Sequence, residues 1–222
     1  LPIYYETLLF MYNRNYMKED DVPATTEELY TYMQEHTADG RYGFVEQHST
    51  AYYSIPWIHG FGGEVISTDG TPLLTSDEVQ KALFLEGYAD STIGGPWLVP
   101  TAREAGIDLG FAPMPVVDDT GLTLAPYSGV QGIHVLKIAA ESKKDAITKV
   151  LECISDPELG TEMALVSGCA PANVKCYEDE RVSGDEMIMT MKQTAQTAVP
   201  MPNIPEMDVM FVVTGNLLVD VN

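Results

Sequence analysis

Positive charge is scarce in this chain of 222 residues. Lysine and arginine together number 12 against 33 aspartates and glutamates, so the formal net charge is −21 at pH 7. Proteins that bind nucleic acid neutralise phosphates with lysine and arginine, and proteins that adsorb to anionic lipid use basic clusters. The composition therefore argues against a nucleic-acid partner and against binding to an anionic membrane surface.

Cysteine is also scarce, and the chain contains only Cys153, Cys169 and Cys176. An odd count in a chain of this length argues against a disulfide framework. Zinc sites need paired short spacings such as CxxC or HxxxH, and neither spacing occurs, so we expect no metal site. Cys169 and Cys176 could form one bridge or remain two free thiols.

Long apolar runs are missing as well. A membrane-spanning helix needs about 18 apolar residues in succession. The longest candidate, residues 207–221, is interrupted by polar residues, so we expect no direct membrane insertion. Residues 1–6 contain neither an initiator methionine nor the basic start of a signal peptide, and we expect them to belong to the middle of a longer protein.

Catalytic and cofactor motifs are absent too. The chain has no GxSxG or phosphate-binding loop, and the glycine-rich run at 60–63 has Val65 where a dinucleotide motif needs glycine. The histidines are scattered without catalytic or metal-ligating spacing: His36, His48, His59 and His134. With so many acids, some pairs approach glycosidase distance by chance. We therefore expect a protein that is not an enzyme and uses no cofactor.

Helix start signals and short alternating segments follow one another along the chain. Capping residues predict helices that begin after Thr25, after Thr75, at Ser142 and at Pro157. Alternation of apolar with other residues predicts strands at 107–111 and 130–136. Short strands between longer helices predict an α/β architecture.

Several aromatic residues lie within a few residues of glycine or proline. They include the pair Tyr52 and Tyr53, Trp97 after Gly-Gly-Pro, and Phe211 shortly after Asn-Ile-Pro. Aromatic faces flanked by carboxylates suit a sugar, because the rings stack on its C–H faces and the acids accept hydrogen bonds from its hydroxyls. The alternative is that these are ordinary core aromatics.

At these residues the sequence resembles the maltose/maltodextrin-binding proteins, the extracellular solute-binding receptors of ABC sugar importers. The resemblance runs in order through most of the chain. It rests on five segments: LPIYYETL with Tyr12-Asn13, PATTEEL from Pro23, Ile58 with Gly62-Gly63-Glu64, GGPW from Gly94, and MPNIPEM from Met201. The resemblance implies a type II periplasmic-binding-protein-like fold with two α/β lobes, closing by a hinge over a ligand in the cleft.

The resemblance also implies a set of ligand-binding residues. Residues at positions that match the family's sugar-binding positions are Glu6, Tyr52, Tyr53, Trp97, Met201 and Phe211. Glu6 matches an acid that accepts sugar hydroxyls, and Phe211 stands where the family has its principal stacking tryptophan. Thr50 replaces an acid and Gly215 replaces an arginine of the family pattern, so the ligand need not be maltose itself.

The family pattern further predicts how the chain divides between the lobes. We expect residues 1–128 mainly in the C-terminal-type lobe, 129–198 in the N-terminal-type lobe, and 199–222 in the C-terminal-type lobe again. Segments 1–8 and 127–136 are expected to cross between lobes in extended form. Parts of the family fold look absent before Leu1, at the joint Leu83–Phe84 and beyond Asn222, so the fold is expected to be incomplete.

The implied function is a receptor that binds a maltodextrin-like oligosaccharide and delivers it to the permease subunits of an ABC importer. Its implied location is extracytoplasmic, in the periplasm or as a cell-surface lipoprotein. Three alternatives stay open: a receptor of the same fold for a different ligand, a carbohydrate-active enzyme that uses an acid such as Glu6, and a non-binding scaffold.

Overall fold

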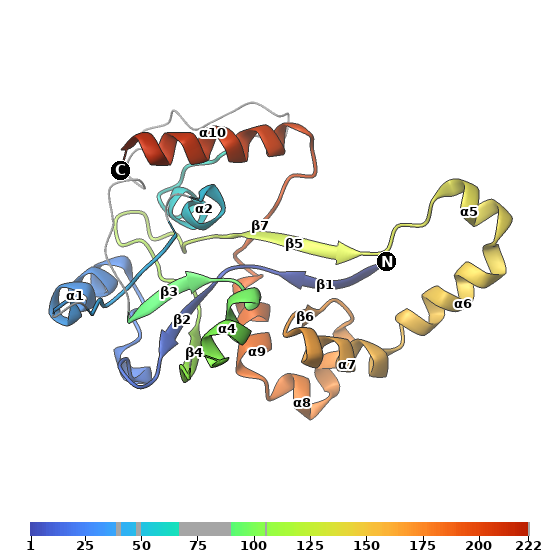
Figure 1. Cartoon of the computed structure of the whole chain (residues 1–222), viewed down its shortest axis with the longest axis horizontal. Helices are drawn as coiled ribbons and strands as arrows, with labels where there is room; N and C mark the ends of the chain where they lie inside the picture. The colour runs from blue at the N-terminus through green and yellow to red at the C-terminus, as the bar shows by residue number, and fades with distance from the viewer. Residues whose placement is uncertain (39–40, 48–49, 67–89, 105, 222) are drawn as a thin grey trace.

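The computed structural model describes residues 1–38, 41–47, 50–66, 90–104 and 106–221, and the side chains of these residues up to 214. Figure 1 shows the arrangement of strands and helices. The strands are β1 (Pro2–Glu6), β2 (Leu9–Asn13), β3 (Ser91–Gly94), β4 (Leu109–Ala112), β5 (Tyr127–Gly132), β6 (Ala170–Pro171) and β7 (Val199–Pro200). The α-helices are α1 (Thr26–His36), α2 (Ala51–Gly60), α4 (Val99–Glu104), α5 (Lys137–Ser142), α6 (Lys144–Ile154), α7 (Pro157–Ser167), α8 (Glu180–Ser183), α9 (Glu186–Thr194) and α10 (Glu206–Val221). Short 3-10 helices are η1 (Glu19–Asp21), η2 (Pro96–Leu98) and η3 (Val174–Glu178).

Two small sheets form the centre of the described structure. One has the order β6-β1-β5-β7, with β1 antiparallel to β5 and β6, and β5 parallel to β7. The other is antiparallel with the order β3-β2-β4. Only Thr7 and Leu8 separate β1 from β2, so one continuous stretch of chain joins the two sheets. In Figure 1, β1 and β5 run side by side, with α2 and α10 on one side and α7, α8 and α9 on the other.

Strand β2 is buried on both faces and contributes to two apolar cores. Phe10 and Tyr12 point into a cluster that includes α1, α2 and α10, while Leu9 and Met11 point into a second cluster with α7 and α9. Successive side chains of a strand point to opposite faces, so one strand can serve two cores. The near-continuous apolar run Leu8–Tyr12 follows from this double burial.

The extended form expected for segments 1–8 and 127–136 is confirmed, and their crossing between lobes stays a prediction. Residues 1–8 contain β1, and residues 127–136 contain β5 without any helical residue. The strand expected at 130–136 is nevertheless too long, because β5 ends at Gly132. Pro2, the first residue of β1, faces Gly132, and beyond this pair only Ile133 continues the pairing, by exchanging two hydrogen bonds with Leu1.

Two helix starts are confirmed and one is wrong. Thr25 caps α1 by accepting a hydrogen bond from the Glu28 backbone, and Asp156 caps α7, which ends at Gly168 with a left-handed φ of 69°. Ser142 instead ends α5, where its hydroxyl donates to the Ile138 carbonyl, and α6 starts two residues later. A hydroxyl used within its own helix does not cap the next one.

Some expectations fall outside the described residues. These are the helix after Thr75 and the joint Leu83–Phe84. The division into lobes at residues 128 and 198 stays a prediction. The cysteines are free thiols, with Cys153 exposed and the other two buried. Within the described ranges, the helices are all too short or too polar to cross a bilayer.

Candidate functional site

Three aromatic rings gather around Tyr52, as the aromatic pattern suggested, and the four rings form one cluster. The centroid of the Tyr52 ring lies 6.1 Å from that of Tyr53, 6.2 Å from that of Trp97 and 6.3 Å from that of Phe211. Two rings come from the first turn of α2, one from η2 and one from α10, which packs against α2. Segments about 160 residues apart in sequence therefore build one aromatic cluster.

The turn Gly94–Trp97 holds Trp97 in an exposed position. Pro96 starts the 3-10 helix, and the indole folds back over Gly95. A Cβ atom at Gly95 would lie 2.3 Å from the indole, so only glycine leaves room for the ring there. The indole Nε1–H donates to the Tyr53 hydroxyl at 3.2 Å, while 47% of Trp97 remains exposed. The ring is thus both fixed and accessible.

Tyr52 connects the cluster to the strand pair of β1 and β5. Its hydroxyl donates to the Tyr127 carbonyl at 3.4 Å, and the Thr7 hydroxyl donates to the same carbonyl at 3.0 Å. Burial, with smaller contributions from the charge of Glu6 and from Tyr53, raises the pKa of Tyr52 to about 12. Tyr52 is therefore a neutral hydrogen-bonding group at pH 7.

Glu6 lies at the end of β1, opposite Gly129 of β5, and is partly buried. The side-chain amide of Gln131 donates to one of its carboxylate oxygens at 3.3 Å. Among the described residues, no lysine or arginine forms an ion pair with Glu6. The carboxylate keeps lone pairs free to accept further hydrogen bonds.

Met201 lies just beyond β7 and next to β5. Its backbone N–H donates to the Ser128 carbonyl, one residue from the carbonyl that Tyr52 and Thr7 share. Its side chain is 40% exposed. The structure therefore brings Glu6, Tyr52 and Met201 to the paired strands β1, β5 and β7, and Tyr53, Trp97 and Phe211 to Tyr52.

The core alternative holds for part of the aromatic set. Tyr52, Tyr53 and Phe211 are partly buried and pack against the larger apolar core. Trp57, from the same helix, belongs to that core fully and donates its indole N–H to Glu46. The cluster is thus continuous with the core, and Trp97 is its most exposed ring.

Residues that position the cluster were not expected from the sequence. Thr7 shares the Tyr127 carbonyl with Tyr52, Gly95 leaves room for the Trp97 indole, and Gln131 donates a hydrogen bond to Glu6. Only Gly95 carried a signal, as part of the Gly-Gly-Pro-Trp turn. The other contacts join residues 75 to 125 positions apart, and no local pattern reports such distances.

Comparison with known proteins adds a family and a fold. A sequence model of the family described as bacterial extracellular solute-binding protein matches residues 1–160. A maltotriose-binding protein of Pyrococcus abyssi is 29% identical, and the match covers 93% of this chain and 51% of that protein. The maltodextrin-binding protein MdxE of Bacillus subtilis is 25% identical, with 99% and 61% covered, and a galactooligosaccharide-binding protein of the same species is 25% identical, with 94% and 57% covered.

Solved structures show the same fold. A cyclo/maltodextrin-binding protein complexed with maltotetraose superposes with a TM-score of 0.83 at 23% identity, covering 100% of this chain and 64% of that one. MalE of Listeria monocytogenes in complex with maltose gives 0.80 at 23% identity, with 99% and 66% covered. The expected type II periplasmic-binding-protein-like α/β fold is confirmed. The chain spans about half to three fifths of the length of the curated relatives it matches.

Proposed function

Because the chain belongs to the bacterial extracellular solute-binding protein family, we propose that it binds an oligosaccharide of the maltodextrin class. In this proposal the ligand rests on the aromatic cluster of Tyr52, Tyr53, Trp97 and Phe211. The observation that carries it is the convergence of these rings on Tyr52, within 6.1 to 6.3 Å, beside Glu6, which has no ion-pair partner among the described residues.

The chemistry of the cluster suits a neutral sugar. The exposed face of Trp97 offers stacking to the C–H face of a pyranose ring, and such a contact stabilises by about 1–3 kcal/mol when well packed. Glu6 accepts hydroxyl hydrogen bonds from the sugar, and Met201 adds an apolar contact beside the strand pair. Each of these roles agrees with the family pattern on which the residues were selected.

The protein acts, in this proposal, outside the cytoplasmic membrane and presents its ligand to the permease subunits of an ABC importer. Family membership supports the extracytoplasmic location, and anchoring as a lipoprotein is a further part of the proposal. The family consists of binding proteins, which supports binding without chemical conversion of the sugar. An enzyme using Glu6 as its acid is the competing hypothesis, and product analysis separates the two.

A second candidate is a galactooligosaccharide or another non-maltodextrin sugar. Its support is the 25% identical relative named for galactooligosaccharides and the presence of Phe211 and Thr50 at positions where the maltodextrin pattern has tryptophan and an acid. A smaller platform and one acceptor fewer would change which sugars fit.

Calorimetric titration tests both candidates with maltotriose, maltotetraose, a galactooligosaccharide and cellotriose. We expect saturable binding of the maltodextrins, with Trp97→Ala weakening it by about 1–3 kcal/mol and the control Tyr30→Ala leaving it unchanged. Tyr30 is a fitting control because it is as exposed as Trp97 and lies on α1. Preference for the galactooligosaccharide favours the second candidate. Absence of sugar binding, or release of shorter sugars during incubation, refutes the proposal.

A further inference from the structure

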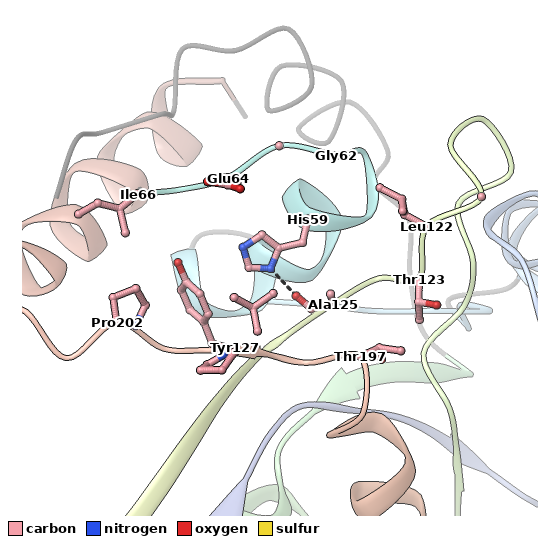
Figure 2. Close-up of a pocket in the computed structure, with 14 residues that line it drawn as sticks. His59, Gly62, Glu64, Ile66, Leu122, Thr123, Ala125, Tyr127, Thr197 and Pro202 are labelled. Atoms are coloured by element: carbon pink, nitrogen blue, oxygen red, sulfur yellow. Dashed lines mark hydrogen bonds between the residues drawn. The ribbon is translucent and has the colours of Figure 1, made fainter. Parts of the chain in front are cut away.

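A cavity whose lining includes none of the four rings lies beside the strands β5 and β7. Its volume is about 800 Å³. Figure 2 shows that its lining comes from the end of α2 and the residues after it, the turn before β5, and the segment through β7. The residues that contribute most to its chemistry are His59, Glu64, Ile66, Leu122, Tyr127 and Pro202.

Among the described residues, the imidazole of His59 has a hydrogen-bond partner at Nδ1 and none at Nε2. Its Nδ1 lies against the Ala125 carbonyl, which can only accept, so the hydrogen is on Nδ1. Burial lowers the pKa of His59 below its ordinary value, partly offset by the carbonyl and by Glu64, and the ring is neutral at pH 7. Its Nε2 is therefore a hydrogen-bond acceptor.

Glu64 adds a negative charge to the same cavity. Figure 2 shows Glu64 on the chain segment that passes over His59, and the Tyr127 ring packs edge-on to the imidazole, with 5.1 Å between the ring centroids. Within the described parts of the chain, Glu64 forms no ion pair. The described lining of the cavity thus presents acceptors and a negative charge, and none of its side chains is a lysine or arginine.

Most of the remaining lining is apolar. Ile66, Leu122, Val199 and Pro202 form walls around the acceptor pair, and Tyr127 contributes its ring. A metal ion is not favoured, because in the described ranges no group of three ligating side chains comes together. A ligand that fits both features has an apolar body and one charged donor group.

We propose that this cavity is a second binding site, which takes a small organic cation. Its ammonium group lies between the Glu64 carboxylate and the Nε2 of His59, and its apolar body packs on Ile66, Leu122 and Tyr127. The ammonium supplies donors that the two acceptors lack, and the net charge of −21 attracts cations toward the protein. The site is chemically different from the aromatic cluster, which has a neutral ligand in our proposal.

Tyr127 contributes to both places, but through different atoms. The Tyr127 carbonyl binds Tyr52 and Thr7, whereas the Tyr127 ring lines the cavity. Occupation of the cavity therefore does not require the four rings, and the two binding events are measurable separately.

Titration of the protein with 2-phenylethylamine, followed by calorimetry or NMR, tests the proposal. Neutral 2-phenylethanol and anionic 3-phenylpropionate serve as matched probes of the same size. We expect saturable binding of the amine only, with an affinity that falls as salt is added. Absence of saturable amine binding up to about 10 mM, or equal binding of the alcohol, overturns the proposal.

Four variants locate the site. We expect Glu64→Gln to weaken amine binding by about threefold to tenfold, while Glu35→Gln, which removes the same charge from exposed α1, leaves it unchanged. Leu122→Lys places a cation at the rim and should abolish amine binding, and this side chain is exposed enough for the protein to fold. Trp97→Ala should leave amine binding intact. Equal effects of the two glutamate substitutions, or loss of amine binding in Trp97→Ala, would contradict the location.

Discussion

The hydrogen bond between Tyr53 and Trp97 makes a sharp prediction about how the aromatic cluster works. The indole N–H donates to the tyrosine hydroxyl at 3.2 Å, so Tyr53 holds the ring that our proposal stacks on the sugar. Tyr53→Phe keeps the aromatic ring and removes only the acceptor. We expect it to lower sugar affinity by about 0.5–1.5 kcal/mol, the usual net value of one hydrogen bond.

A double-mutant cycle separates positioning from direct contact. Trp97→Ala should cost about 1–3 kcal/mol of sugar affinity, because it removes one aromatic platform. If Tyr53 acts by holding Trp97, adding Tyr53→Phe to Trp97→Ala should cost almost nothing more. The coupling energy then equals nearly the whole effect of the single Tyr53 substitution.

Calorimetry with maltotriose measures the affinity of the unchanged protein, of the two single variants and of the double variant. Tryptophan fluorescence is an independent measurement. Trp97 is 47% exposed and Trp57 only 4%, so acrylamide quenches mainly Trp97. Tyr53→Phe should change the quenching of Trp97, whereas Tyr30→Phe on α1 should not. Additive affinity losses in the cycle would refute the argument, because they would mean that the Tyr53 hydroxyl meets the sugar directly.

Three further predictions concern the same region. Gly95→Ala brings a Cβ atom within 2.3 Å of the Trp97 indole and should displace the ring. Calorimetry should therefore show a loss of sugar affinity close to that of Trp97→Ala. The control Gly129→Ala should have little effect, because the nearest atom to its Cβ would be 3.9 Å away. Burial raises the pKa of Tyr52 and Tyr127 to about 12, above their unfolded value near 10, so their stabilising contribution is complete below pH 10 and is lost as the pH rises toward 12. Urea unfolding measured across that range should show this decline, and it should be less steep in Tyr52→Phe. Sugar affinity measured between low and high salt should stay constant, since no ion pair joins protein and neutral ligand, and a steep salt dependence would contradict the sugar assignment.

Local signals predicted the α/β class and several element boundaries. Helix ends depend on residues close by in sequence, such as the N-caps Thr25 and Asp156 and the left-handed Gly168. The sequence alone therefore predicts where these helices start or end. Ser142 shows the limit of this reasoning. A serine hydroxyl can cap the next helix or bond back to its own, and the choice depends on where the preceding helix begins.

The candidate site was only partly predictable, for a different physical reason. The aromatic residues are visible in the sequence, and the family pattern selected six site residues in advance. The contacts that orient them are long-range: Thr7 and Tyr52 meet one carbonyl of Tyr127, and Gln131 meets Glu6. Such contacts depend on the pairing register of β1 with β5, which places Glu6 opposite Gly129, and no short motif specifies that register.

An aromatic residue of this cluster can pack against the core and also belong to the stacking surface that we propose for the sugar. Tyr52, Tyr53 and Phe211 pack against the apolar core, which limits their motion, and Tyr52 and Tyr53 also contact Trp97. A stacking surface gains affinity when its rings are already held in place, because little conformational entropy is then lost on binding. Burial of three rings is thus a physical condition for the exposed fourth to act as a platform. The same packing explains why Trp57, one helical turn further along α2, stays wholly within the core.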